Sequence, residues 1–309
     1  MSERVEVAIG DRTLSLSNLD KVLYPEVGFT KSQIIDYYAR VAPYMLPHIA
    51  GRCMTLRRWP NGVDQQSFFE KRCPGHRPEW VSTALGPGDG DEGIEYCRID
   101  EPASLVWTAN LAALELHSPM ARCSDLDTPT MLVFDLDPGE PAGIPECCRV
   151  ALALRDLLGA VGLEAVAKTS GAKGMQLYVP LNTPHTHHHA SSFALAAGQV
   201  VARDQPDKVL VEMKKSLRKG KVFVDWSQNS RHKTTIAPYS LRARSHPTVS
   251  TPLSWDEVSD GADGADGSNG EALRFEAEAV LDRVDRLGDL FESAASLEQQ
   301  LPSPKQTSG

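Results

Sequence analysis

The chain has 309 residues, 41% of them hydrophobic, and a formal net charge of −9, which suits a globular protein with a sizeable core. Its first residues lack the basic and then apolar pattern of a secretory signal, and no stretch approaches the roughly 20 apolar residues of a membrane span. The composition argues against a secreted or membrane protein and predicts a cytoplasmic one without a membrane partner.

The N-terminal part predicts one long helix followed by short strands. Thr30 and Gln33 form a capping-box pattern ahead of apolar residues at helical spacing, so a helix is expected from Thr30 to Ile49. Strand-like runs, an exposed turn and a second helix follow, at Met54–Trp59, Ser67–Lys71, Gly86–Gly93 (turn), Ile94–Ile99 and Glu101–His117 (helix).

Strands and helices alternate in the middle of the chain, which predicts an α/β fold with a mixed central sheet and flanking helices. Strands are expected at Met131–Asp137, Glu164–Lys168, Met175–Pro180, Val209–Met213 and Lys221–Trp226, with helices at Pro145–Val161 and Ala190–Ala202. We assign residues 1–300 to one domain, with an N-terminal part (1–125), a core (126–250), a flexible acidic loop (260–270) and C-terminal helices (271–300, the first over 271–287). Residues 301–309 are predicted to be disordered.

The cysteines and histidines do not predict a metal site. The six cysteines contain no C-x-x-C pair, so we expect reduced, mostly buried thiols rather than a zinc site or a disulfide framework. The histidines of the cluster His185, His187, His188 and His189 follow Pro184, where a loop enters a helix, and we expect them to be solvated rather than ligands.

The net charge hides a basic segment. Residues 251–309 contain 13 acidic and 4 basic side chains, so the rest of the chain is balanced. Within it, residues 208–244 hold ten Lys or Arg against only Glu212 and Asp225. Such an excess attracts phosphates, although a solvated lysine-rich loop has the same composition.

Three aspartates predict a metal site. The run MLVFDLDPG is an apolar strand that ends in Asp135 and Asp137, which project to the same side because strand side chains alternate. Asp225 ends a second apolar strand, where an isolated acid is costly unless it is paired or bound to a metal. Three convergent carboxylates can hold two Mg²⁺ or Mn²⁺ ions about 4 Å apart, as in-line nucleotidyl transfer requires.

The segment TSGAKGMQ, residues 169–176, suits a polyphosphate. Its two glycines let backbone amides approach an anion, its serine donates a hydrogen bond and its lysine supplies charge. It lacks the order of a P-loop, and a glycine-containing turn between two strands remains the alternative.

FDLDPGE, TSGAKGMQLYVP, KSLRKGKVFVDWSQN and KTTIAPYSLRAR together resemble the motifs of the polymerase domain of bacterial DNA ligase D, within the archaeo-eukaryotic primase superfamily. The resemblance covers roughly residues 10–290 and includes NLDKVLYP, RRWPNG and FFEK. It implies a primase-like catalytic core and a template-dependent polymerase that fills gaps or extends broken ends in end joining. We find no ligase or phosphoesterase segment, so a stand-alone relative or an isolated domain is expected.

The resemblance also implies residue roles. Asp135, Asp137 and Asp225 match the metal-binding acids, and the nucleoside triphosphate is implied to contact His117, Ser170, Lys173, Gln176, Gln228 and Arg242. At the position of Gln176, relatives usually have a histidine. Glutamine can donate a hydrogen bond through its amide, but unlike histidine it cannot become cationic. We therefore expect Gln176→His to strengthen nucleotide binding or activity.

DNA contacts follow from the same resemblance. Lys21 and Lys31 match the pocket for the 5′-phosphate of a downstream strand, and Arg218 matches a residue at the primer terminus. Phe68 and Phe69 alternate faces, so we expect one in the core and the other stacked on a template base. Gapped or broken DNA, the Ku end-binding protein and a separate ligase are the implied partners, with a nucleoid-associated location.

Two other functions remain open. A haloacid-dehalogenase-like phosphatase also places D-x-D at a strand end, but Pro138-Gly139-Glu140 and the single Asp225 fit that family poorly. A noncatalytic module that binds DNA ends could keep the fold without activity, and Gln176 keeps that possibility open. The complete set of three acids favours the polymerase.

Overall fold

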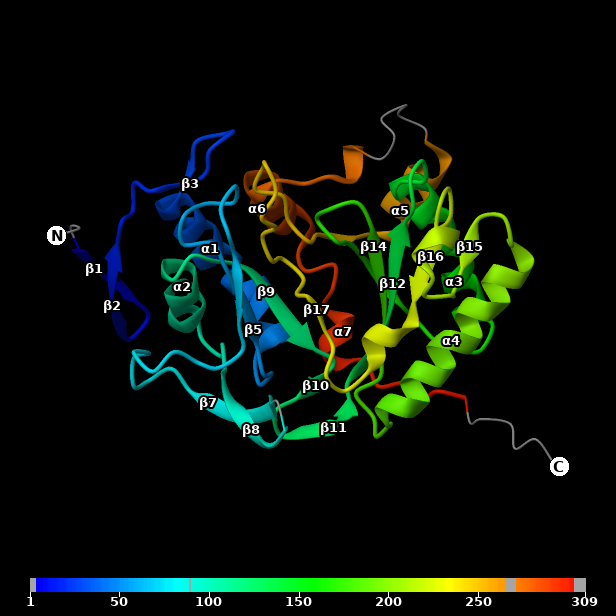
Figure 1. Cartoon of the computed structure of the whole chain (residues 1–309), viewed down its shortest axis with the longest axis horizontal. Helices are drawn as coiled ribbons and strands as arrows, with labels where there is room; N and C mark the ends of the chain where they lie inside the picture. The colour runs from blue at the N-terminus through cyan, green and yellow to red at the C-terminus, as the bar shows by residue number, and fades with distance from the viewer. Residues whose placement is uncertain (1–3, 89, 265–270, 303–309) are drawn as a thin grey trace.

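The computed structural model describes residues 4–88, 90–264 and 271–302. Two sheets lie in opposite halves of the molecule, one built mostly from the N-terminal third and the other from residues 131–253 (Figure 1). The C-terminal helix α6 (Ala277–Leu287) returns to the N-terminal half, where Val280, Leu281 and Val284 join its core. Among the described residues, no helix is both long and apolar enough to cross a membrane.

The N-terminal half is built around helix α1 (Lys31–Ile49) and a sheet of order β17-β9-β5-β6. The predicted start of α1 is confirmed, because Thr30 and Gln33 form a capping box. The sheet strands are β5 (Thr55–Arg58), β6 (Phe68–Glu70), β9 (Ala113–Pro119) and β17 (Thr234–Ile236). Two small antiparallel pairs precede α1, namely β1 (Arg4–Ile9) with β2 (Arg12–Ser17) and β3 (Val22–Tyr24) with β4 (Phe29–Thr30).

The helix predicted over Glu101–His117 is wrong in its second half. Helix α2 (Pro102–Asn110) ends early, and Ala112, with a φ of 57°, turns the chain into β9. The residues of β9 pair with β5 on one side and β17 on the other, and this pairing outweighs their helical spacing. His117 therefore lies on a strand instead of at a helix end.

The turn predicted at Gly86–Gly93 is also partly wrong. Strands β7 (Thr83–Gly88) and β8 (Gly90–Cys97) pair far into this segment, and Gly86 is buried. A Cβ atom on Gly86 would lie 2.6 Å from the Tyr96 ring, so the close approach of that ring requires glycine here. Residue 89 lies outside the described residues.

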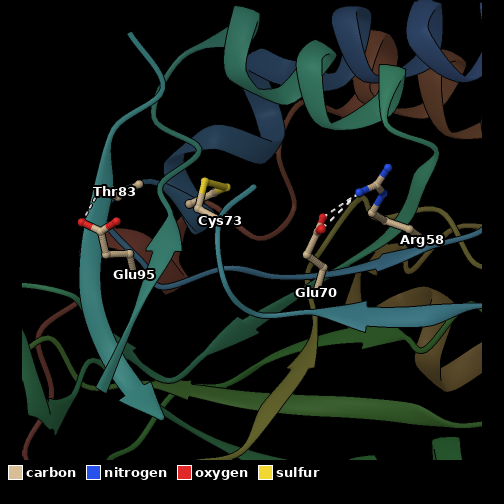
Figure 2. The surroundings of a disulfide bond; sticks show 6 residues. Arg58, Glu70, Cys73, Thr83 and Glu95 are labelled. Atoms are coloured by element: carbon tan, nitrogen blue, oxygen red, sulfur yellow. Dashed lines mark hydrogen bonds and ion pairs between the residues drawn. A yellow bond between two sulfur atoms is a disulfide. The ribbon is translucent and has the colours of Figure 1, made fainter. Parts of the chain in front are cut away.

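The expectation that all cysteines are reduced is wrong for one pair. Cys73 and Cys97 form a disulfide, with Cα atoms 4.8 Å apart (Figure 2). The backbone brings them together, since the Cys73 amide donates to the Glu95 carbonyl of β8 at 2.8 Å. Spacing along the chain could not show this, because the contact depends on how the β7–β8 hairpin packs. Cys53, Cys123, Cys147 and Cys148 are free thiols.

The second half contains a six-stranded sheet of order β15-β16-β12-β14-β13-β18. Its strands are β12 (Met131–Pro138), β13 (Val166–Thr169), β14 (Met175–Pro180), β15 (Val209–Leu210), β16 (Val222–Asp225) and β18 (Pro252–Leu253). The β15–β16 pair is parallel and the others are antiparallel, which confirms the predicted mixed sheet. Between the two sheets along the chain lie β10 (Ala121–Arg122) and β11 (Asp125–Pro129).

Helices cover one face of this sheet. They are α3 (Ile144–Gly159), α4 (His187–Asp204) and α5 (Trp255–Asp263). Leu132, Phe134 and Leu136 of β12 share a core with these helices. Because strand side chains alternate, Asp135 and Asp137 project from the opposite face, where Phe291 and Ala294 pack against Val133.

The C-terminal segment departs from its predicted boundaries. Helix α5 continues to Asp263 and ends at Gly264, whose φ is 61°, so the predicted loop at 260–270 begins within a helix. Residues 265–270 lie outside the described residues, as do 303–309 of the predicted tail. The helix predicted over 271–287 consists of a 3-10 turn (Glu271–Leu273) and then α6, and α7 (Ser293–Ser296) follows. Leu301 is buried, which contradicts disorder at that residue.

Candidate active site

Four polar side chains form one row across the face of the six-stranded sheet opposite α3, α4 and α5. Asp135 on β12 is the register partner of Asp225 on β16 and of Gln176 on β14, and Gln176 is in turn the partner of Lys168 on β13. Cross-strand partners point to the same face, so Asp135 and Asp225, which are 90 positions apart in the sequence, meet here. The structure thus brings together the two strand ends that the sequence singled out.

Hydrogen bonds hold both carboxylates of the row. The Gln176 amide donates to Asp135 Oδ1 at 3.1 Å. Asp225 Oδ1 accepts from the Ser227 hydroxyl at 2.6 Å and from its backbone amide at 2.9 Å, and Asp225 Oδ2 accepts from Gln228 at 2.9 Å. Gln228 therefore supports a carboxylate in this structure, and its predicted nucleotide contact stays a prediction.

Lys168 is a buried lysine behind the carboxylates that the sequence analysis did not single out. Its ammonium donates to Gln176 Oε1 at 2.5 Å and to the Ser250 hydroxyl at 2.6 Å. Burial holds the pKa of Lys168 well below its ordinary value, while the nearby Asp135 opposes this shift. The sequence could have pointed to Lys168 only if the pairing of β13 with β14 were known, because that register places Lys168 opposite Gln176.

Asp137 lies at the outer end of the same strand face. Its side chain is 46% exposed, and the Arg218 guanidinium lies 3.9 Å from Asp137 Oδ2. Burial and the charge of Asp225 raise the pKa of Asp137, whereas Arg218 and Lys173 lower it. Arg218 also lies over the Phe223 ring at 3.8 Å. Arg218 therefore lies beside Asp137, and its predicted contact with a primer terminus stays a prediction.

The charge balance of the acids suits a cation. Burial, and then the charge of Asp137, raise the pKa of Asp135 to about 7. Among the described residues, no three His, Cys, Asp or Glu side chains are already grouped as a metal site. Asp135 and Asp225 accept hydrogen bonds from Gln176, Ser227 and Gln228, which fix the positions of these carboxylates. Carboxylate oxygens are the ligands that Mg²⁺ and Mn²⁺ prefer, and a bound cation would offset the repulsion between the acids.

The loop after β13 forms a compact turn beside the acids. The Ser170 hydroxyl accepts from the amides of Ala172 at 3.3 Å and Gly174 at 3.2 Å. Gly171 has a φ of 67°, and a Cβ atom there would lie 2.7 Å from the Val249 backbone, so both conformation and space require glycine. Lys173 is exposed at the tip.

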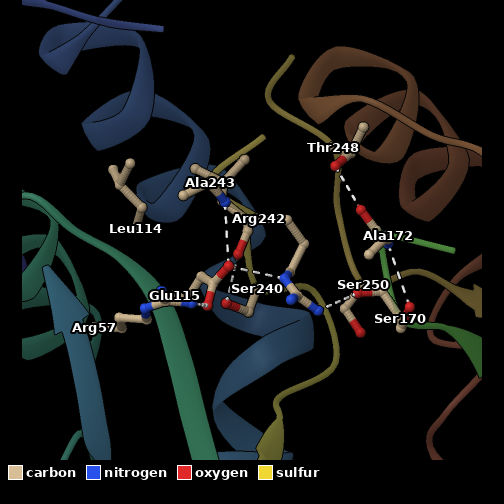
Figure 3. Close-up of polar contacts among 12 residues, drawn as sticks. Arg57, Leu114, Glu115, Ser170, Ala172, Ser240, Arg242, Ala243, Thr248 and Ser250 are labelled. Atoms are coloured by element: carbon tan, nitrogen blue, oxygen red, sulfur yellow. Dashed lines mark hydrogen bonds and ion pairs between the residues drawn. The ribbon is translucent and has the colours of Figure 1, made fainter. Parts of the chain in front are cut away.

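Glu115 joins this loop to the other sheet, and the sequence analysis did not identify it. It accepts from Arg242 Nε at 2.9 Å and from Arg57 Nη1 at 3.4 Å (Figure 3). His117 Nε2 lies 3.1 Å from Glu115. Arg242 also donates to the Ser170 carbonyl at 2.6 Å. Burial opposes ionisation, but His117 and Arg242 hold the pKa of Glu115 at about 2. The predicted residues His117, Ser170 and Arg242 thus form one connected group.

The two phenylalanines do not divide between core and solvent as predicted. Phe68 and Phe69 are 45% and 58% exposed, because β6 is a short edge strand of its sheet. Arg58 lies over Phe68 at 5.2 Å and Arg57 over Phe69 at 4.9 Å. The Phe69 ring is also 5.7 Å from the His117 ring, which brings it beside the Glu115 group.

Lys21 and Lys31 are neighbours at the start of α1. The Lys31 amide donates to the Lys21 carbonyl at 2.9 Å. The buried Lys31 ammonium donates to the Ser17 carbonyl at 2.6 Å, and Lys21 donates to Asn61 at 3.2 Å. Burial, with help from the charges of Lys21 and Arg58, lowers the pKa of Lys31 to about 8. The predicted phosphate contact of Lys21 and Lys31 stays a prediction.

The histidine cluster has protein partners at three positions. His185 Nδ1 and His189 Nδ1 lie 3.3 Å apart, and the Leu301 amide donates to His185 Nε2 at 3.3 Å. His187 contacts the carbonyls of Asn229 and Leu126 at 2.8 Å and 3.1 Å. His189 Nε2 also lies 3.2 Å from the Pro302 carbonyl, so His185 and His189 contact residues 301 and 302, and His187 ties α4 to the segment after β16.

Comparisons with known proteins agree with this geometry. Residues 30–291 match the family model described as the LigD primase-polymerase domain. The multifunctional non-homologous end joining DNA repair protein LigD of Mycobacterium tuberculosis (strain ATCC 25618 / H37Rv) is 47% identical over 290 residues, covering 91% of this chain and 37% of that protein. The bifunctional non-homologous end joining protein LigD of Bacillus subtilis (strain 168) is 30% identical over 279 residues, covering 90% and 43%.

A solved structure matches the whole fold. It is the polymerase domain from Mycobacterium tuberculosis ligase D in complex with DNA, with a TM-score of 0.85 and 45% identity over 93% of this chain and 99% of that one. The chain therefore spans 37% of the length of the mycobacterial relative but nearly all of its solved polymerase domain.

Proposed function

Since the chain belongs to the LigD primase-polymerase domain family, a family of nucleotidyltransferases, we propose that it adds ribo- or deoxyribonucleotides to a DNA 3′ end as a template directs. One observation carries this proposal. Asp135 and Asp225 are register partners on the sheet face opposite α3, α4 and α5, with Asp137 beside them and Lys173 and Arg218 close enough to lower the pKa of Asp137.

The three acids would hold two divalent ions, Mg²⁺ or Mn²⁺. Such ions activate an attacking 3′-hydroxyl and stabilise the pyrophosphate that leaves. Gln176, Ser227 and Gln228 orient the carboxylates through the hydrogen bonds described above. Carboxylates that hydrogen-bond donors already hold in place lose little conformational freedom when they bind a cation, so these three residues position the acids for the metal.

The nucleotide's triphosphate would lie against the Ser170 loop and the Glu115 group. Lys173 supplies an exposed ammonium, and Arg242 and His117 supply cationic or donor groups that Glu115 holds in place. Gln176 is 4% exposed and engaged with Asp135, so its effect on the triphosphate is exerted through that carboxylate. Donors fixed before binding favour a polyanion.

DNA would contact the N-terminal half. Phe68 and Phe69 offer exposed rings that would stack on template bases. Arg218, which lies beside Asp137, would contact the primer terminus, and Lys21 with Lys31 would bind a downstream 5′-phosphate. The natural substrate would be gapped or broken DNA in end joining. Ku and a separate DNA ligase would supply end binding and sealing, in a cytoplasmic, nucleoid-associated setting.

Primer extension tests the proposal. A gapped duplex with a labelled primer and a 5′-phosphate is incubated with nucleotides and Mn²⁺ or Mg²⁺. Wild type and the surface control Asp285→Asn should lengthen the primer, whereas Asp225→Asn and EDTA-treated wild type should not. DNA binding without extension by wild type would instead indicate the noncatalytic module. Phosphate release from small esters without extension would indicate the phosphatase.

A further inference from the structure

Two free cysteines outside the acid site lie in direct contact. Cys53 Sγ is 3.0 Å from Cys123 Sγ, and the two residues are 70 positions apart in the sequence. A disulfide bond is about 2.05 Å long, so the sulfurs need to approach by only about 1 Å to become bonded. No feature of the proposed polymerase site uses either thiol.

Backbone contacts hold the two segments in this position. The Cys123 amide donates to the Gly51 carbonyl at 2.7 Å, and Arg122 Nη1 donates to the Ala50 carbonyl at 3.2 Å. The Gly51 amide donates to Asp100 at 2.7 Å, which fixes the turn before β5. The thiols therefore meet between two restrained segments, the end of α1 and the turn between β10 and β11.

The two thiols differ chemically. Hydrogen bonding between them, helped by the positive charge of Arg98, lowers the pKa of Cys123. The same hydrogen bond and burial raise the pKa of Cys53. A thiolate is the nucleophilic form of cysteine, so Cys123 is the sulfur prepared to attack and Cys53 is the sulfur that keeps its proton.

The pair is also reachable by small molecules. Cys123 is half-buried, and Cys53 lines a cavity of about 350 Å³ together with Lys71, Tyr96, Pro119 and Arg231. Cys147 and Cys148, by contrast, are fully buried, and burial raises the pKa of both. Cys53 itself is 2% exposed, so Cys123 is the sulfur of this pair that solvent reaches, and Cys147 with Cys148 is a buried internal control.

We propose that Cys53 and Cys123 are a site of reversible oxidation by peroxides. The Cys123 thiolate attacks one oxygen of hydrogen peroxide, the O–O bond breaks, and the leaving hydroxide takes up a proton to become water. The Cys53 thiol then attacks the sulfur of the Cys123 sulfenic acid and releases a second water. Two thiols and one peroxide give one disulfide and two waters, and a thiol reductant reverses the change.

The bond would join the segment before β5 to the β10–β11 turn. A cross-link between residues 70 positions apart restricts the unfolded chain, so oxidation should raise the midpoint of thermal unfolding. The rise should be lost again on treatment with dithiothreitol. It should be absent from Cys53→Ser and from Cys123→Ser.

Peptide mapping of the full chain tests the site. The protein is treated with one equivalent of hydrogen peroxide and digested with trypsin under non-reducing conditions, and the fragments are sequenced by tandem mass spectrometry. We expect peptide 53–57 joined to peptide 123–149 through Cys123, with Cys147 and Cys148 still alkylated as free thiols. Oxidation of Cys147 or Cys148 before this pair, or no 53–123 bond at ten equivalents, overturns the proposal.

Single variants test the two roles. Cys53→Ser should accumulate a sulfenic acid on Cys123 that dimedone traps, whereas Cys123→Ser should leave Cys53 at least tenfold less labelled. Equal dimedone labelling of Cys53 and Cys123 in these variants overturns the assignment. If a variant fails to fold, as judged by circular dichroism, brief iodoacetamide labelling of wild type decides instead, because Cys123 must alkylate first.

Discussion

The Gln176 amide nitrogen donates a hydrogen bond to Asp135 Oδ1 at 3.1 Å, across strands β14 and β12. The amide oxygen of Gln176 accepts from the Lys168 ammonium and from the Tyr178 hydroxyl, at 2.5 Å and 3.2 Å. Both ends of the amide are therefore occupied, and Gln176 links the buried Lys168 to a proposed metal ligand. Glutamine suits this place because it accepts and donates at once.

This contact changes what we expect from Gln176→His. The variant should alter the apparent Mn²⁺ affinity severalfold, because the ring replaces the donor that orients Asp135. The KM for the nucleotide should change less. Primer extension titrated with Mn²⁺ at saturating nucleotide, and then with nucleotide at saturating Mn²⁺, separates the two effects. A change confined to the nucleotide titration would show that residue 176 acts on the triphosphate directly, as the sequence alone suggested.

Asp135→Asn should stabilise the metal-free protein at pH 8. Because the pKa of Asp135 is raised to about 7, the folded state holds this proton more tightly than the unfolded state does. Wild-type stability is therefore lost as pH rises from about 4 toward 7, and the variant avoids the loss. We expect its free energy of unfolding to be higher by about 1–3 kcal/mol at pH 8.

Urea unfolding at pH 5 and pH 8 in EDTA checks this expectation, with Asp285→Asn as the control. The advantage of Asp135→Asn should shrink at pH 5, where wild-type Asp135 is protonated. Added Mn²⁺ should stabilise wild type more than the variant at pH 8. An advantage that is equal at both pH values would mean that Asp135 is not the titrating group.

The 5′-phosphate preference should depend on pH through Lys31. Its pKa of about 8 means that the ammonium is mostly charged at pH 7 and mostly neutral at pH 9. The phosphate preference is the ratio of the affinity for a gapped duplex that carries the phosphate to the affinity for one that ends in hydroxyl. This ratio should therefore fall severalfold from pH 7 to pH 9. Fluorescence anisotropy at fixed salt measures both duplexes. Lys21→Ala/Lys31→Ala should show no phosphate preference at either pH, and an unchanged preference in that variant rules out the pocket.

Glu115→Gln should destabilise the protein near neutral pH. The pKa of Glu115, about 2, lies below its ordinary value, so its ionised form contributes stability above about pH 4.5 that is lost as pH falls toward 2. The variant leaves Arg242, Arg57 and His117 without their shared anion. We expect a loss of about 2–3 kcal/mol at pH 7 that narrows at pH 3.

Urea unfolding at the two pH values measures the loss, and the exposed Glu298→Gln is the matched control. The same variant should weaken nucleotide binding, since Arg242 would no longer be held against the Ser170 loop. A loss of stability that is constant from pH 7 to pH 3 would contradict the assigned pKa.

The local chemistry of this protein could be predicted from its sequence. The capping box at Thr30 and Gln33, the apolar strand ending in Asp135 and Asp137, and the motifs of the primase-polymerase family are all short-range patterns that a few neighbouring residues define. The mixed sheet followed from the alternation of such segments. These features depend on backbone preference and on which side chains share a face, both of which repeat locally.

Only the tertiary structure decided which distant residues meet. Lys168, Gln176, Asp135 and Asp225 form one row because of the order and register of four strands, and a shift by one residue would turn each side chain to the other face. Glu115 joined the site because residues 113–119 pair as a strand instead of continuing a helix. The Cys73–Cys97 bond and the Cys53–Cys123 contact likewise depend on packing between segments, which spacing along the chain does not encode.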